Sequence, residues 1–243
     1  MSPVREDGNI QENERLKGFE RAVKDLQAVM FDLDGTLIDS IPAYLRIAAA
    51  MLDKVGLPPA PREAVAAMLK EGLSGFHRLI PSEMSHRKEE LIEACFRAGK
   101  EIATRLYPDS APLIPGVSDL FRCLDKAGIR IGIVSSSQKE YIETKLYPLK
   151  EAGIDSLVES VIVIEDTSEM KPSPEPVAAC AGRLGVEEAK SLFVGDTDVD
   201  ILAGKRAGTF TIGVLTGVDD YETLLAQTPD IILPGVRELI PLF

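Results

Sequence analysis

Short apolar runs recur along the chain and alternate with segments that have the spacing of amphipathic helices. The runs that we interpret as buried strands cover residues 28–32, 130–135, 159–164, 191–196, 209–214 and, more weakly, 230–233. Between them, segments such as 118–128 and 139–153 carry apolar residues at helical spacing, and Pro148 is expected to kink or end the second. This alternation predicts an α/β protein with a parallel sheet covered by helices on both faces.

Strand signals disappear between residues 41 and 112, where three helical patterns follow one another. The first has Asp39 or Ser40 as a candidate cap and Pro42 in its first turn. We therefore predict an α/β core of residues 28–40 and 113–243, with a small helical cap, residues 41–112, inserted through two hinge connections. Residues 1–27 are expected to form an N-terminal extension with a short helix.

Composition excludes several classes of protein. The 243 residues are 45% hydrophobic, which is ordinary for a globular chain, and 39 acidic against 27 basic residues give a formal charge of −12. Such a charge disfavours nucleic acid and anionic membrane surfaces as partners. No run resembles a signal peptide or a membrane span, so we expect a cytoplasmic protein. Cys95, Cys123 and Cys180 are scattered and predict neither disulfides nor a zinc site.

Polar side chains follow the ends of several predicted strands. Because the carboxyl ends of parallel strands meet at one edge of a sheet, these side chains are expected to lie close together. Two like charges 4 Å apart repel by about 4 kcal/mol at an effective dielectric near 20, so a cluster of aspartates there requires a cation. Ligands that are all oxygen favour Mg²⁺. The candidates are Asp32, Asp34, Ser135, Ser136, Ser137, Lys171, Asp196 and Asp200.

Four short motifs carry a family resemblance. In order they are DLDGTLIDS (32–40), VSS (134–136), KPSPEP (171–176) and GDTDVD (195–200). Together they resemble the four motifs of the haloacid dehalogenase superfamily of phosphohydrolases, and most closely its phosphoglycolate-phosphatase-like branch. The resemblance covers residues from about 28 to 243. It implies a Rossmann-like parallel sheet with an inserted helical cap.

The resemblance also implies roles for individual residues. Asp32 matches the nucleophile that becomes an aspartyl phosphate, and Asp34 matches the general acid and base. For Asp34 to hold a proton near neutrality, burial and the neighbouring carboxylates are expected to raise its pKa. Ser135 and Lys171 match the phosphoryl ligands. The remaining matches are Gly35, Thr36 and Ser136 for substrate binding, and Asp32, Asp34, Asp196 and, through water, Asp200 for Mg²⁺.

The function that follows is Mg²⁺-dependent hydrolysis of a small phosphate monoester, with a phosphoglycolate-like metabolite favoured as the partner. Lys70 and Arg78 flank a turn of the expected cap and are candidates to meet a substrate carboxylate. A β-phosphoglucomutase-like sugar phosphomutase shares all four motifs and remains an alternative. A phospho-acceptor signalling domain, an alternative from another class, also uses an acidic rim, but it lacks an inserted cap. The sequence does not indicate an oligomeric state.

Overall fold

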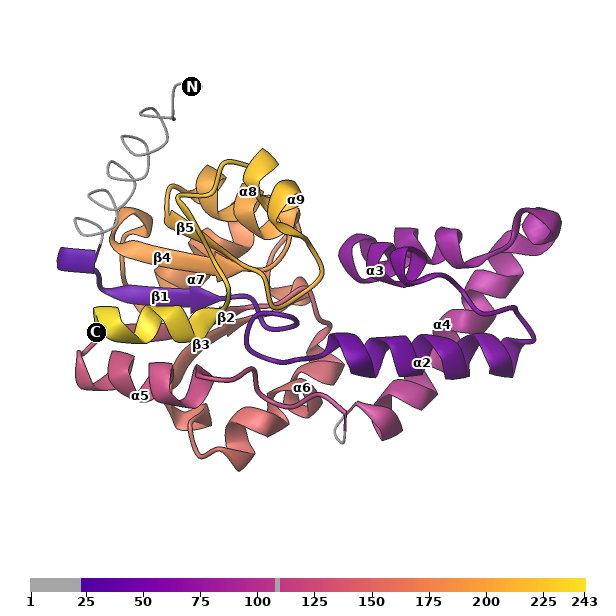
Figure 1. The fold of residues 1–243 in the computed structure, drawn as a ribbon, viewed down its shortest axis with the longest axis horizontal. Coiled ribbons are helices and arrows are strands. Elements are labelled where there is room, and N and C mark those ends of the chain that lie inside the picture. Colours follow the sequence, from indigo (N-terminus) through magenta and orange to yellow (C-terminus); the bar gives the residue numbers. More distant parts are fainter. Residues whose placement is uncertain (1–22, 108–109) are drawn as a thin grey trace, which may run out of the picture.

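The computed structural model describes residues 23–107 and 110–243, without the side chains of residues 69–74. These residues form one sheet of six parallel strands in the order β3-β2-β1-β4-β5-β6 (Figure 1). Each strand overlaps one of the predicted runs and differs from it by one or two residues at its ends, so the predicted α/β class is confirmed. The strands are β1 (Ala28–Phe31), β2 (Arg130–Val134), β3 (Val158–Ile162), β4 (Ser191–Gly195), β5 (Phe210–Val214) and β6 (Ile231–Leu233).

The central strand β1 lies where the chain reverses its direction across the sheet. From β1 the chain moves outward to β2 and β3, and it then returns to the other side of β1 to form β4. Phe31 is therefore in register with Ile133 on one side and with Val194 on the other. At such a reversal the connections leave in opposite directions and open a crevice at the carboxyl ends of the strands.

Helices cover both faces of the sheet (Figure 1). Val29 and Phe31 point to the face covered by α5, where the rings of Phe31 and Phe121 lie 5.5 Å apart. Met30 points to the opposite face, which α7 and α8 cover. The helices that follow β1 in the core are α5 (Val117–Lys126), α6 (Lys139–Glu151), α7 (Glu175–Leu184), α8 (Asp198–Ala207) and α9 (Tyr221–Ala226). Pro148 lies inside α6, which continues to Glu151, so the proline does not end the helix.

The helical insertion, of which residues 41–107 and 110–112 are described, projects from the carboxyl edge of the sheet (Figure 1). Its helices are α2 (Ile41–Val55), α3 (Arg62–Glu71) and α4 (Lys88–Leu106), and α2 packs against α4. Ser40 is the residue before α2 and Pro42 lies in its first turn, so Asp39 is one position too early to be the cap. The remaining short 3-10 turns are η1 (Gly72–Leu79), η2 (Ser82–Arg87), η3 (Asp155–Leu157), η4 (Ile164–Asp166), η5 (Glu188–Lys190) and η6 (Val236–Leu242).

The two connections to the helical insertion run side by side. The Asp39 amide donates to the Pro112 carbonyl at 2.8 Å, and the Ile114 amide donates to the Leu37 carbonyl at 2.9 Å. An antiparallel bridge between Ile38 and Leu113 lies between these bonds. The expected domain boundaries at residues 41 and 112 agree with this pairing but remain a prediction. Residues 1–22 of the expected extension lie outside the described residues.

None of the helices in the described ranges is long and apolar enough to cross a membrane.

The contact between β1 and α5 leads to a stability prediction. Phe121 is fully buried, so Phe121→Ala should leave a cavity and lower the free energy of unfolding by about 3–5 kcal/mol. Tyr221 is 47% exposed, and Tyr221→Ala should cost about 1 kcal/mol or less. Urea unfolding followed by circular dichroism measures both. Equal losses in the two variants would contradict the assignment of Phe121 to the core.

Candidate active site

Three buried carboxylates meet at the carboxyl edge of the sheet. Asp32 directly follows β1, Asp196 directly follows β4, and Asp200 lies in the first turn of α8. Each offers one oxygen to a group whose members all lie within 4.8 Å of one another. Their residues are 7%, 0% and 1% exposed, respectively, so water screens their repulsion poorly. The arrangement therefore needs positive charge, either from the protein or from a bound cation.

Lys171 supplies part of that charge. Its Nζ atom lies 2.5 Å from Asp32 Oδ1 and 2.5 Å from Asp200 Oδ1, and its side chain is 3% exposed. The residue comes from the loop between η4 and α7, and it also donates to the Val134 carbonyl at 3.2 Å. Burial favours the neutral amine, but the two carboxylates outweigh it and hold the pKa of Lys171 above its ordinary value.

One ammonium does not neutralise three carboxylates. Burial raises the pKa of Asp32 to about 7, although Lys171 acts in the opposite direction. Burial, followed by the charges of Asp32 and Asp200, also holds the pKa of Asp196 well above its usual range. In the absence of a further cation, the cluster therefore favours bound protons near neutrality.

The loop after β1 packs directly on Asp196. Gly35 has a φ of +90°, and a Cβ atom there would lie 2.5 Å from Asp196 Oδ2, so only glycine fits this turn. The Thr36 hydroxyl donates to Asp196 Oδ1 at 2.9 Å, and the Val218 amide donates to Oδ2 at 2.9 Å. Thr36 and Val218 thus hold the carboxylate of Asp196 in place, and Gly35 leaves room for it.

The serines after β2 lie beside the same edge. Ser135 is buried, and its hydroxyl donates to Ser137 Oγ at 2.9 Å. Ser136 is exposed and lines the cavity described below. Ser137 also accepts a hydrogen bond from Lys145 Nζ at 2.7 Å. The structure thus places the predicted phosphoryl ligand Ser135 within a hydroxyl pair beside the cluster.

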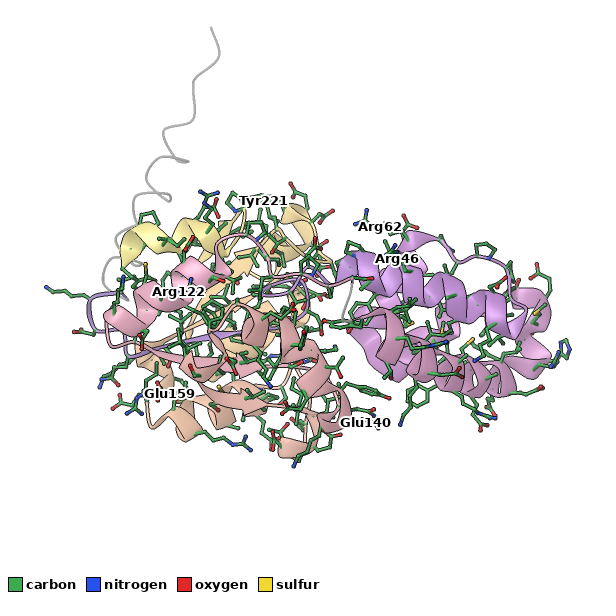
Figure 2. All side chains as sticks on the ribbon, turned by 90° about the horizontal axis from the view of Figure 1, so that it is seen from below. Arg46, Arg62, Arg122, Glu140, Glu159 and Tyr221 are labelled. Carbon is green, nitrogen blue, oxygen red and sulfur yellow. The ribbon has the colours of Figure 1, made fainter. Side chains whose placement is uncertain are left out.

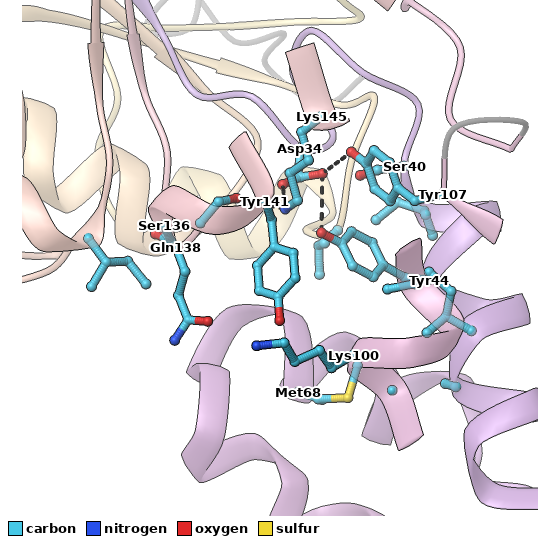
Figure 3. Close-up of a pocket in the computed structure, with 18 of the residues that line it drawn as sticks. Asp34, Ser40, Tyr44, Met68, Lys100, Tyr107, Ser136, Gln138, Tyr141 and Lys145 are labelled. Carbon is cyan, nitrogen blue, oxygen red and sulfur yellow. Dashed lines mark hydrogen bonds and ion pairs between the residues drawn. The ribbon is translucent and has the colours of Figure 1, made fainter. Parts of the chain in front are cut away.

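Asp34 is not a member of the acidic cluster and lies instead beside Tyr44, Tyr107 and Lys145 (Figure 3). The Tyr107 hydroxyl donates to its Oδ1 at 2.6 Å, the Tyr44 hydroxyl lies 3.4 Å from the same oxygen, and the Lys145 ammonium pairs with Oδ2. Burial acts to raise the pKa of Asp34, but the charge and hydrogen bond of Lys145, together with hydrogen bonds from Tyr107 and Ser40, outweigh it, and the pKa is lowered. The expectation of a raised pKa was therefore wrong, because the nearest charge is an ammonium rather than another carboxylate.

A cavity of about 340 Å³ separates the sheet edge from the helical insertion. Asp32, Asp34 and Lys171 line the part at the sheet, and α6 lines one side with Tyr141, Thr144 and Lys145. The opposite wall comes from α2, α3, η1 and α4, which contribute mostly apolar side chains such as Met51, Met68, Phe76 and Phe96. Lys100 on α4 pairs with Glu140 on α6, and Glu140 lies at the boundary between the core and the insertion (Figure 2).

The structure does not place either of the two cations predicted for the cap, Lys70 and Arg78, in the cavity. The side chain of Lys70 lies outside the described residues, and Arg78 is exposed and does not line the cavity. The sequence reasoning missed Tyr44, Tyr107 and Lys145, which surround Asp34. Only their positions in the sequence could have indicated them. Both tyrosines lie next to a hinge connection, and Lys145 lies in the second turn of the helix that follows the motif VSS.

The fold and the acidic edge are typical of α/β enzymes that act on phosphate esters. The chain belongs to the family of haloacid dehalogenase-like hydrolases, whose family model matches residues 29–214. A phosphoglycolate phosphatase of Neisseria gonorrhoeae is 32% identical over 90% of this chain and 93% of its own length. A pyrophosphatase of Bacillus velezensis is 30% identical over 89% of this chain and 96% of its own.

The solved structure of a predicted phosphoglycolate phosphatase of Haemophilus somnus shares the fold. It has a TM-score of 0.79 and 23% identity, and the match covers 89% of this chain and 97% of the other. The predicted family and the predicted enzyme class, a phosphatase of the haloacid dehalogenase type, are thus confirmed.

The raised pKa of Asp32 predicts a pH dependence of stability. Folded Asp32 keeps its proton up to about pH 7, whereas the unfolded chain releases it near its ordinary value of 3.8. Between these values the folded state binds more protons, so the free energy of unfolding should fall by about 1–4 kcal/mol as pH rises through this window.

Urea unfolding in EDTA at several pH values measures this slope. Asp32→Asn should flatten it, whereas Asp53→Asn, at an exposed position of α2, should not. A stability that rises with pH over the same window would contradict the assigned charge balance.

Proposed function

We propose that the protein hydrolyses small phosphate monoesters through an aspartyl-phosphate intermediate on Asp32. The observation that carries this proposal is the buried carboxylate of Asp32, which lines the cavity and lies beside both Lys171 and the other two aspartates. An oxygen of Asp32 attacks phosphorus, and the bond to the ester oxygen breaks. Water then attacks the phosphorus of the intermediate, which releases phosphate and restores Asp32.

Asp34 is proposed as the group that handles the protons. It lines the same cavity two residues after Asp32. As an acid it gives a proton to the leaving ester oxygen, and as a base it takes a proton from the attacking water. The lowered pKa of Asp34 matches the base form, which the second step requires. Lys171 offsets negative charge on the phosphoryl oxygens in both steps.

The acidic cluster fits Mg²⁺. Three buried carboxylates share one ammonium, which leaves an excess of negative charge, and all the donors are oxygen atoms. We assign Asp32 and Asp196 as direct ligands and Asp200 as a ligand through water. The carboxylate of Asp34 pairs with Lys145 instead. We therefore do not assign the side chain of Asp34 as a metal ligand, although the sequence predicted it as one. When bound, the metal would stabilise charge on the transferring phosphoryl group.

A phosphoglycolate-like substrate is the favoured choice. Relatives that match most of this chain are named phosphoglycolate phosphatases, and one is named a pyrophosphatase. Release of phosphate from p-nitrophenyl phosphate tests the reaction class, and a panel that contains phosphoglycolate and pyrophosphate tests the substrate. If the protein releases phosphate from none of the compounds of the panel in the presence of Mg²⁺, the proposed function is contradicted.

The nucleophile has a direct test. Asp32→Asn should lower kcat by several orders of magnitude, because the amide has nearly the same shape but does not attack phosphorus. The control, Asp53→Asn, changes an exposed carboxylate of α2 and should retain full activity. Circular dichroism confirms that both variants fold. More than a tenth of wild-type kcat in Asp32→Asn would rule out Asp32 as the nucleophile.

The metal ligands can be ranked by their Mg²⁺ requirement. Asp200 already accepts hydrogen bonds from Lys171 and Thr197 at 2.5 Å each, which favours contact with the metal through water. We therefore expect Asp196→Asn to raise the half-saturating Mg²⁺ concentration more than Asp200→Asn does. Activity is measured across a Mg²⁺ titration. Activity that persists in excess EDTA would show that neither residue holds a required metal.

A further inference from the structure

Lys145 is a cation of the cavity to which the proposed reaction assigns no role. Its side chain is 13% exposed, and its Nζ atom bonds Asp34 and, at 2.7 Å, Ser137 Oγ. Among the described residues, two other lysines line the cavity, and each pairs with carboxylates other than Asp34. Lys171 lies between Asp32 and Asp200, and Lys100 is half-exposed and holds both carboxylate oxygens of Glu140 at 2.9 and 2.8 Å.

The position of Lys145 separates it from the phosphoryl end of the site. The phosphoryl group is expected next to the carboxylate of Asp32, which is the proposed nucleophile and pairs with Lys171. Asp34 must reach the leaving ester oxygen if it is to protonate that atom. Lys145 pairs with Oδ2 of Asp34, so we expect its ammonium to lie near the atoms that follow the ester oxygen in the leaving group.

The surroundings of Lys145 have the chemistry of a carboxylate site. The rings of Tyr44 and Tyr107 lie 5.2 and 5.6 Å from its Nζ atom. The hydroxyls of both tyrosines and the ammonium converge on one carboxylate, that of Asp34 (Figure 3). Three donors that meet in a place shielded from water bind an anion more strongly than they would at the surface.

From this arrangement we propose that Lys145 is a specificity-determining residue, which binds a carboxylate on the leaving group of the substrate. Tyr44 and Tyr107, which come from the two ends of the helical insertion, complete the subsite. The enzyme accordingly selects phosphate esters of small hydroxy acids over neutral esters of the same size. The inference rests on the proposed phosphatase function and deepens it, and it assigns to the core helix α6 a role that the sequence had assigned to Lys70 or Arg78.

The test compares two substrates in three enzymes. Phosphoglycolate carries a carboxylate, whereas ethyl phosphate has a similar length and lacks it. Lys145→Met keeps most of the length of the side chain and removes its charge, and Lys145→Arg keeps the charge. We expect Lys145→Met to lower the ratio of the two kcat/KM values at least about 10-fold, mainly through a higher KM for phosphoglycolate. Lys145→Arg should retain most of the wild-type ratio.

A control variant and a comparison of kcat separate a role in substrate binding from a role in positioning Asp34. Lys150→Met removes an exposed lysine from the last turn of the same helix and should leave the ratio unchanged. Equal losses of kcat on both esters in Lys145→Met would show that Lys145 acts only by positioning Asp34, and would overturn the proposal.

The proposal can also be tested without turnover. Calorimetric titration of the Asp32→Asn protein with phosphoglycolate, with and without Lys145→Met, measures binding alone. Affinity that is about 10-fold or more weaker in the double variant supports the carboxylate subsite. Equal affinity overturns it. A wild-type protein that binds phosphoglycolate through Lys145 but releases no phosphate would contradict the proposed function alone.

Discussion

The repulsion among three buried carboxylates is the constraint on which the rest of the site depends. Asp32, Asp196 and Asp200 cannot all be ionised in a dry pocket without compensating charge. Lys171 provides one charge and leaves the others to a proton or a metal. A site with this imbalance is prepared to accept a cation and, with that cation, the negative charge of a phosphate ester.

The parallel sheet sets the distances within this cluster. β1 and β4 are neighbours in register, so the residues that follow them leave the sheet side by side. Gly35 then lets the chain turn tightly over Asp196, where a larger residue would collide with the carboxylate. The chemistry at the edge is therefore fixed by the backbone of the core, whereas the opposite wall of the cavity is built by helices from the insertion.

Much of the fold was predictable because strands and helices differ in the period of their apolar residues. Asp32, Asp196 and Lys171 were predictable as neighbours because each follows a strand of the same parallel sheet. The groups that the side chain of Asp34 faces were not predictable. It depends on Lys145 and Tyr107, which lie far from it in the sequence and meet it only when α6 and the insertion pack on the core. Local motifs carry no information about such a long-range contact.

The antiparallel bridge between Ile38 and Leu113 brings the two ends of the insertion together at one point of the core. A loop whose ends meet in this way adds little strain to the sheet, and its entropic cost grows only slowly with its length. Helices could therefore be lengthened, shortened or exchanged in this segment during evolution without a change in the register of the strands. The catalytic edge and the wall that faces the substrate can in this way diversify at different rates.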